Sequence, residues 1–189
     1  TMRGNPAKVC HHYMQIETED SMKKMGLRLD SNISEVTWQG SGEVVITNVE
    51  KLTCSGEKCQ DLHTCDPMKL RVHYEAYRKV KAPIIGIAIY TSDMLVLSAF
   101  SNESASLDMV MEGEGRFECI IPSLPMLPGI YSIGVSIKGR DNSLIYKGLH
   151  LTSFNMQYNS RSKQSRGFIH IEPEWNFAPG NKTEKSIST

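Results

Sequence analysis

The stretch ECIIPSLPMLPGIYSIGVSI, residues 118–137, decides the fold, because it places a proline-rich segment directly before a strand-like run. Pro122, Pro125 and Pro128 have no backbone N–H to donate to a sheet, and Pro128-Gly129 is a turn dipeptide. Such a segment cannot extend a strand. The stretch therefore predicts one strand, a crossover pinned by prolines, and a second strand.

Two segments alternate apolar and polar residues as half-buried antiparallel strands do. In residues 69–77 the apolar face holds Leu70, Val72, Tyr74 and Ala76. In residues 130–138 it holds Tyr131, Ile133, Val135 and Ile137. Residues 82–90 are apolar on both faces, which predicts a central strand, and Gly86 within them predicts a bulge or a close approach. Further strands are expected at 42–52, 94–100, 105–111, 116–121, 143–157 and 167–172.

Short strands separated by turn residues about every ten residues are the pattern of an all-β sandwich. With about nine strands and almost no helical periodicity, the sequence predicts two packed antiparallel sheets over residues 34–177. Before them, Asn5 as N-cap and Pro6 at the first helical position predict a short helix, so residues 1–33 are assigned to a short helix and a linker. Residues 178–189 are expected to form a flexible tail.

The composition argues against several classes of function and location. Lysine plus arginine and aspartate plus glutamate both number 21, so no net field favours nucleic acid or an anionic bilayer. No apolar run approaches the roughly 18 residues that a membrane helix needs. The first residues lack the layout of a secretory signal, and the five cysteines form no regular disulfide framework. These features predict a cytosolic protein with reduced thiols.

The sequence contains no motif that specifies an enzyme. A phosphate-binding loop, a Gly-x-Ser-x-Gly elbow and a His-Glu-x-x-His helix are all absent, so we assign no catalytic residue and expect no cofactor. Glu112 and Glu114 are interpreted as hairpin-turn residues. Paired Cys-x2-Cys motifs are also absent, which favours a polar loop with reduced cysteines over a zinc site. The nearest approach to a zinc site is a set of four residues: Cys54, Cys59, His63 and Cys65.

One polar strand face carries the groups that a hydroxyl-rich neutral ligand requires. It combines donors, acceptors and an aromatic plane, in Arg71, His73, Glu75 and Tyr77. Ser132 and Ser136 would complete this face if their strand lies in the same sheet. The alternative is an ordinary solvated sheet face. Trp38 and Trp175 are open to the same two interpretations, either as sugar platforms or as core or edge aromatics.

The order of these segments resembles a known family. The residues that carry the resemblance are GEVVITNV, KLRVHYEA, APIIGIAIY, the crossover GEGRFECIIPSLPMLPGIYSIGVSI and finally RGFIHIEPEWNF. Over residues 40–177 the chain is similar to the C-terminal carbohydrate-binding domain of Wzt-type subunits, the ATP-binding components of O-antigen polysaccharide ABC transporters. Ahead of it, GNPAKVCHHY resembles the end of the preceding ATPase domain in such subunits.

The resemblance implies an immunoglobulin-like β-sandwich that binds O-antigen polysaccharide on its undecaprenyl carrier without catalysis. It also implies a homodimer that exchanges a C-terminal strand, and attachment through the full-length ATPase subunit to a transmembrane transporter at the cytoplasmic face of the bacterial inner membrane. Nucleic acid is not among the expected partners. The proline segment would connect the two sheets, and Tyr131 would form a tyrosine corner. The alternatives are a dimerisation module that binds no glycan and a carbohydrate-active enzyme.

Overall fold

The computed structural model describes residues 38–59, 61–93, 95–105, 109–160, 162 and 165–174 of this 189-residue chain. The helix and linker expected in residues 1–33, the tail expected in residues 178–189, and Trp175 lie outside these residues. The described residues between Trp38 and Gln157 form nine strands. They are β1 (Trp38–Gln39), β2 (Val44–Leu52), β3 (Asp61–His63), β4 (Met68–Lys81), β5 (Ile84–Thr91), β6 (Val96–Ser101), β7 (Val110–Ile121), β8 (Gly129–Lys138) and β9 (Leu144–Gln157).

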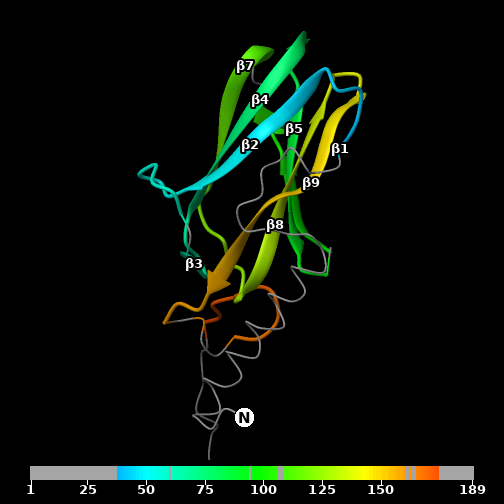
Figure 1. Ribbon diagram of the computed structural model, residues 1–189. Coiled ribbons are helices and arrows are strands. Elements are labelled where there is room, and N and C mark those ends of the chain that lie inside the picture. The colour runs from blue at the N-terminus through cyan, green and yellow to red at the C-terminus, as the bar shows by residue number, and fades with distance from the viewer. Residues whose placement is uncertain are drawn as a thin grey trace, which may run out of the picture.

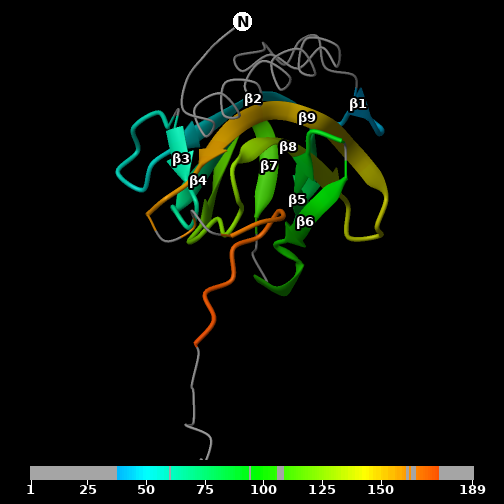
Figure 2. The ribbon, with the colours of Figure 1, turned by 90° about the horizontal axis from the view of Figure 1, so that it is seen from below.

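The strands form two layers, which Figures 1 and 2 show in two views. The larger sheet has the order β1-β9-β8-β5-β6, with β3 beside β9, and the smaller sheet has the order β2-β4-β7. Neighbouring strands are antiparallel except that β3 runs parallel to β9. The predicted all-β antiparallel sandwich is therefore confirmed.

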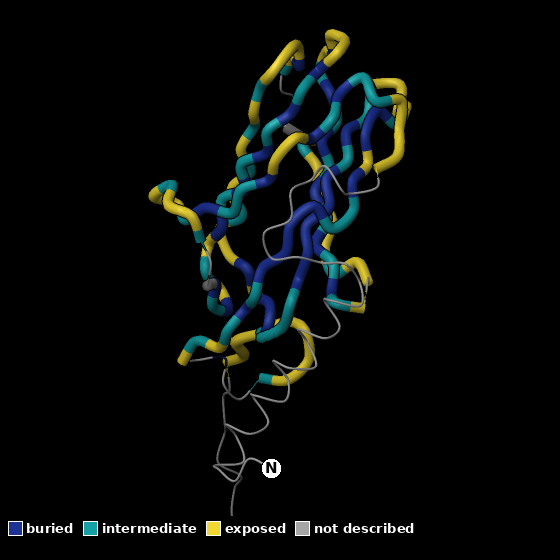
Figure 3. Tube along the Cα trace, in the orientation of Figure 1, coloured by how far each residue is buried: buried dark blue, intermediate teal, exposed yellow. Residues whose placement is uncertain are grey.

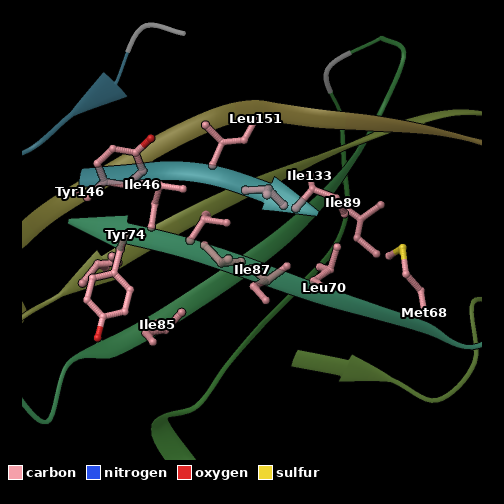
Figure 4. Close-up of a cluster of buried hydrophobic side chains, with 14 of the residues drawn as sticks. Ile46, Met68, Leu70, Tyr74, Ile85, Ile87, Ile89, Ile133, Tyr146 and Leu151 are labelled. Carbon is pink, nitrogen blue, oxygen red and sulfur yellow. The ribbon is translucent and has the colours of Figure 1, made fainter. Parts of the chain in front are cut away.

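The core lies between the two sheets, where the predicted apolar faces meet. All four apolar-face residues of β4 and all four of β8 are buried, so both alternation patterns are confirmed. In Figure 3 the longest buried stretches lie in strands, whereas the turns are largely exposed; β6 and β7 are mostly exposed or half-buried. Figure 4 shows that side chains of both sheets meet in this core, with Ile46, Leu70 and Tyr74 from the smaller sheet and Ile85, Ile87, Ile133 and Leu151 from the larger sheet.

The proline segment crosses from β7 in the smaller sheet to β8 in the larger sheet, as predicted. Its apolar side chains Leu124, Met126 and Leu127 are buried beneath it. Backbone hydrogen bonds fix it on two sides. The Leu124 N–H donates to the backbone carbonyl of Asp66 at 3.0 Å, and the Leu127 N–H donates to that of Phe168 at 2.9 Å. The prolines cost no hydrogen bond here because the segment belongs to neither sheet.

A tyrosine corner closes the crossover. The buried Tyr131 hydroxyl donates to the Leu127 carbonyl at 2.8 Å, four residues upstream. Burial raises the pKa of Tyr131 to about 12. The hydroxyl therefore stays protonated as the donor that joins the end of the crossover to the start of β8.

Three local predictions were wrong. The strands expected at 105–111 and 116–121 are one strand, β7, and the hairpin expected at Glu112 and Glu114 does not exist. Gly115 pairs with Tyr74 of β4, and its missing side chain leaves room for the Tyr74 ring, which a Cβ there would overlap. Residues 167–172 form no strand, and pair only through an isolated bridge between Ile169 and Met126. The short strands β1 and β3 were not anticipated.

Candidate functional site

The predicted polar face lies on the outside of the smaller sheet, on its central strand β4, and its groups contact one another. Arg71 Nε donates to Glu118 Oε1 at 2.9 Å, and Arg71 Nη1 lies 3.6 Å from Glu50 Oε2. His73 Nε2 lies 3.2 Å from the same Glu50 oxygen. The hydrogen bond from Arg71 holds the pKa of Glu118 below its usual value. We call this surface the charged face; it comprises Lys69, Arg71, His73, Glu75, Tyr77, Glu50, Glu114 and Glu118.

At the other end of the charged face, the Tyr77 hydroxyl donates to Glu75 Oε2 at 2.9 Å. This hydrogen bond to a carboxylate raises the pKa of Tyr77. Glu75 and Glu114 stand directly opposite each other on β4 and β7, an arrangement that like charges make unfavourable. A hollow of about 490 Å³ lies beside them, lined by Thr47, His73, Tyr74, Glu114, Gly115 and Arg116.

Ser132 and Ser136 do not belong to the charged face, so the expectation that they complete it is wrong. They lie on β8, in the larger sheet, whereas β4 is the centre of the smaller sheet. Alternation along a strand predicts which face a residue occupies but not which strand lies beside it. The outer faces of two layers with a shared core point in opposite directions. Ser132 and Ser136 lie on the outer side of the larger sheet, and the charged face lies on the outer side of the smaller sheet.

That other face contains a hollow of about 280 Å³, which we call the outer hollow. Its floor is made of small residues on adjacent strands: Gly86 and Ala88 on β5, Ala99 on β6, and Gly134 on β8. Tyr90, Ser101, Ser136 and Lys147 supply polar or aromatic groups around it. A Cβ at Gly86 would stand 2.6 Å from Ser136 Oγ, and one at Gly134 would stand 2.9 Å from Tyr90 Cε2. The glycines therefore leave the space that these two side chains occupy.

Tyr90 is held at this site by a neighbour from β9. Its ring centroid lies 5.0 Å from that of His150, with the planes inclined by 54°. His150 has a positive φ of 53° at an irregularity in the pairing of β8 and β9, and its Nδ1 lies 2.6 Å from Ser132 Oγ. Burial lowers the pKa of His150. The neutral ring thus packs against Tyr90 and is itself fixed by Ser132.

Lys147 brings a positive charge to the outer hollow. It pairs in register with Ser136, across the β8–β9 ladder, and its side chain is exposed. It forms no ion pair or hydrogen bond with any residue that the structure describes. The chemistry gathered here is two aromatic rings, of Tyr90 and Phe100, three hydroxyls, of Tyr90, Ser101 and Ser136, and one ammonium group beside small residues.

Of the six predicted binding residues, only Ser136 lines the outer hollow. The reasoning from sequence missed Tyr90, Ser101 and Lys147. One signal could have found the site, because Gly86, Ala88 and Gly134 are small residues at alternating positions of two strand segments. A strip of this kind on an outer face leaves room for a ligand to approach the backbone.

Two other predictions concern metal binding and Trp38. Within the described parts of the chain, no group of three or more histidine, cysteine or acidic residues is placed to hold a metal ion, and His63 Nδ1 instead lies 3.3 Å from Asp66. Trp38 stacks on Tyr146 with ring centroids 5.6 Å apart, which fits the edge-aromatic interpretation. No helix among the described residues is both long and apolar enough to cross a bilayer.

A family model and one solved domain agree with this architecture. The family model described as Wzt C-terminal domain matches residues 35–171. A crystal structure of the C-terminal domain of wzt superposes with a TM-score of 0.66 at 14% sequence identity, covering 77% of this chain and 90% of that one. A Niemann-Pick type C2 protein from Japanese carpenter ant gives a TM-score of 0.40 at 10% identity, over 65% of this chain and 99% of that one. No curated protein matches the chain by sequence.

Proposed function

The chain belongs to the family of Wzt C-terminal domains, and from that premise we propose that it is a non-catalytic carbohydrate-binding domain of an O-antigen ABC transporter. Its ligand would be the O-antigen polysaccharide on an undecaprenyl carrier, selected for export at the cytoplasmic face of the bacterial inner membrane. The observation that carries this proposal is the outer hollow, which sets an aromatic ring and hydroxyls around a floor without bulky side chains.

We propose that one sugar ring packs against Tyr90 while its hydroxyls bond to Ser101 and Ser136. Sugars present apolar C–H faces that suit an aromatic plane and hydroxyl edges that suit directed hydrogen bonds. The small floor residues allow the ring to approach the backbone of β5 and β8 closely. A hollow of about 280 Å³ has room for only part of a polymer. Weak affinity is therefore expected, at roughly 4 to 8 kcal/mol for each domain, or millimolar to micromolar dissociation constants.

The charged face remains a second candidate for the same function, through Arg71, His73, Glu75 and Tyr77. The hollow beside His73 favours it, because a ligand could enter there. Its disadvantage is that Arg71, His73 and Tyr77 already contact carboxylates of the same face. A glycan would have to displace or share those contacts, and exposed ion pairs of this kind are individually worth little.

We also propose a homodimer that exchanges a C-terminal strand, and contact with the transmembrane transporter subunit through the full-length ATPase. The segment from residue 165 to residue 174 is the part of the described chain that fits such an exchange. It pairs with the crossover through a single bridge and leaves three large apolar side chains exposed: Phe168, Ile169 and Ile171. Two linked domains would bind one polymer with higher effective affinity than one domain alone.

The test is calorimetric titration of the protein with purified O-polysaccharides of different repeat structure. We expect saturable binding to one polymer, abolished by the double variant Tyr90→Ala/Ser136→Ala and retained in Arg71→Ala/Tyr77→Ala. The reverse pattern would move the site to the charged face. A folded dimer that binds no polymer would overturn the proposal in favour of a dimerisation module, and shortened polymer after incubation would show an enzyme.

A further inference from the structure

Acidic residues are divided unevenly between the strands of the two sheets, although the formal net charge of the chain is zero. Strands β1, β5, β6, β8 and β9 contain no aspartate or glutamate, and their lysines are Lys138 and Lys147. The three strands of the smaller sheet contain seven lysines and arginines, several of which pair with some of its five glutamates: Glu50, Glu75, Glu112, Glu114 and Glu118. The acidic groups of the sandwich strands are therefore concentrated away from the outer hollow.

Both lysines of the larger sheet lie on its outer face. Lys147 stands opposite Ser136, and Lys138 follows Ser136 by two residues on β8. The Lys138 Nζ donates to Asn142 Oδ1 at 3.0 Å, a neutral partner. In the same turn the Asp141 carboxylate accepts hydrogen bonds from the N–H and the hydroxyl of Ser143, which lower its pKa. None of the described residues that line the outer hollow is acidic.

We propose that the ligand group bound in the outer hollow is anionic and that the Lys147 ammonium group pairs with it. The inference rests on the proposed glycan-binding function and narrows the ligand to an acidic polysaccharide, whose charge is a sugar carboxylate or a phosphate substituent. A lysine that pairs with no acidic group among the described residues, beside hydroxyls and an aromatic ring, offers an anion both attraction and hydrogen-bond donors. On the smaller sheet, Lys69 and Arg71 already face glutamates, whereas no acidic residue lines the outer hollow among the described residues, so an anion meets less competition at the outer hollow.

The test uses small sugars, so that it does not depend on identifying the polymer. Isotope-labelled protein is titrated with glucuronate, glucose 1-phosphate and glucose while the backbone amides of Gly134 and Ser136 are followed by NMR. We expect saturable shifts with at least one of the two anions and none with glucose at equal concentration. The anion that binds with the higher affinity indicates whether the natural ligand carries a carboxylate or a phosphate. Higher ionic strength should weaken the binding, because the pair is exposed.

Two lysine variants complete the test. Lys147→Gln should weaken binding of the anion about fivefold, the upper range for an exposed ion pair. Lys79→Gln removes the same charge from the smaller sheet, where Lys79 pairs with Glu112, and should leave the affinity unchanged. The inference is overturned if glucose shifts these amides as the anions do, if no sugar shifts them, or if the two variants behave alike.

The outcome for the anion is separable from the outcome for the proposed function. If Lys147→Gln binds a neutral O-polysaccharide at the outer hollow as well as the unmodified protein does, glycan binding stands and the anionic ligand is wrong. If glucuronate or glucose 1-phosphate binds at Gly134 and Ser136 but no polysaccharide binds, the anion site stands and the export function is wrong.

Discussion

The hydroxyl of Ser136 on β8 occupies the space that a side chain on Gly86 of β5 would fill, since a Cβ at Gly86 would stand only 2.6 Å from it. The two residues are paired in register across the centre of the larger sheet. Because Gly86 has no side chain, the Ser136 hydroxyl on the next strand can lie above it. The pairing of β5 with β8 therefore affects the outer hollow directly, because Gly86 leaves the space in which the Ser136 hydroxyl lies.

Gly86→Ala should weaken glycan binding while the protein stays folded. The new Cβ would force the Ser136 hydroxyl to rotate away, and the loss of one hydrogen bond of about 0.5–1.5 kcal/mol corresponds to a loss of affinity of roughly two- to tenfold. Gly129→Ala is the matched control, because a Cβ there meets nothing closer than 3.5 Å. Calorimetric titration of both variants checks this, and equal affinities would mean that Ser136 takes no part in binding.

A pair of tyrosine variants tests the tyrosine corner. Tyr131→Phe leaves the buried Leu127 carbonyl without its donor, so we expect a loss of about 1–3 kcal/mol in the free energy of unfolding. Tyr146→Phe removes a hydroxyl that is also buried but has no hydrogen-bond partner among the described residues, so it should be neutral or stabilising. Urea unfolding followed by fluorescence measures both changes. A loss of stability for Tyr146→Phe as large as that for Tyr131→Phe would contradict the assignment.

The sequence predicted those features that depend on one strand at a time. The alternation of β4 and β8 follows from burial of one face, and the prolines exclude the crossover from a ladder wherever it lies. Features that depend on a second strand were missed or wrong. Gly113 and Gly115 look like turn residues until Tyr74 is known to lie across from Gly115.

The candidate site shows the same limit. Ser136 was predicted to bind the ligand together with the charged face. It lies on the other sheet, because alternation does not say which sheet contains β8. Tyr90 reads from the sequence as the end of an apolar strand. It becomes an aromatic wall only because the irregular pairing of β9 brings His150 against it. In each case the role of the residue depends on which strand lies beside it in space, and the residue type alone does not reveal that strand.

Arg71→Ala should raise the pKa of Glu118 towards its ordinary value, because the hydrogen bond from Arg71 is the main cause of its depression. A carboxyl group whose pKa is lowered by folding stabilises the protein above its unfolded pKa, and that stability is lost as the pH falls through the folded pKa. The variant should therefore lose less stability on acidification. Arg78→Ala is the control, because Arg78 pairs with Glu43 instead. An NMR titration of the glutamate carboxyls that shows the same pKa for Glu118 in both variants would refute the charged-face contact.

The last prediction concerns His150, whose pKa is lowered by burial. The unfolded chain binds a proton at His150 more readily than the folded protein does, so stability should fall as the pH drops below about 6.5, the ordinary histidine pKa. Protonation would also disturb the ring that packs against Tyr90. His150→Asn removes the titration and suits the positive φ of 53°, since asparagine tolerates that region. Urea unfolding at about pH 7.5 and about pH 5.5, roughly one unit on either side of that pKa, should show a smaller decrease for the variant. An identical decrease in both proteins would assign the acid sensitivity to other groups.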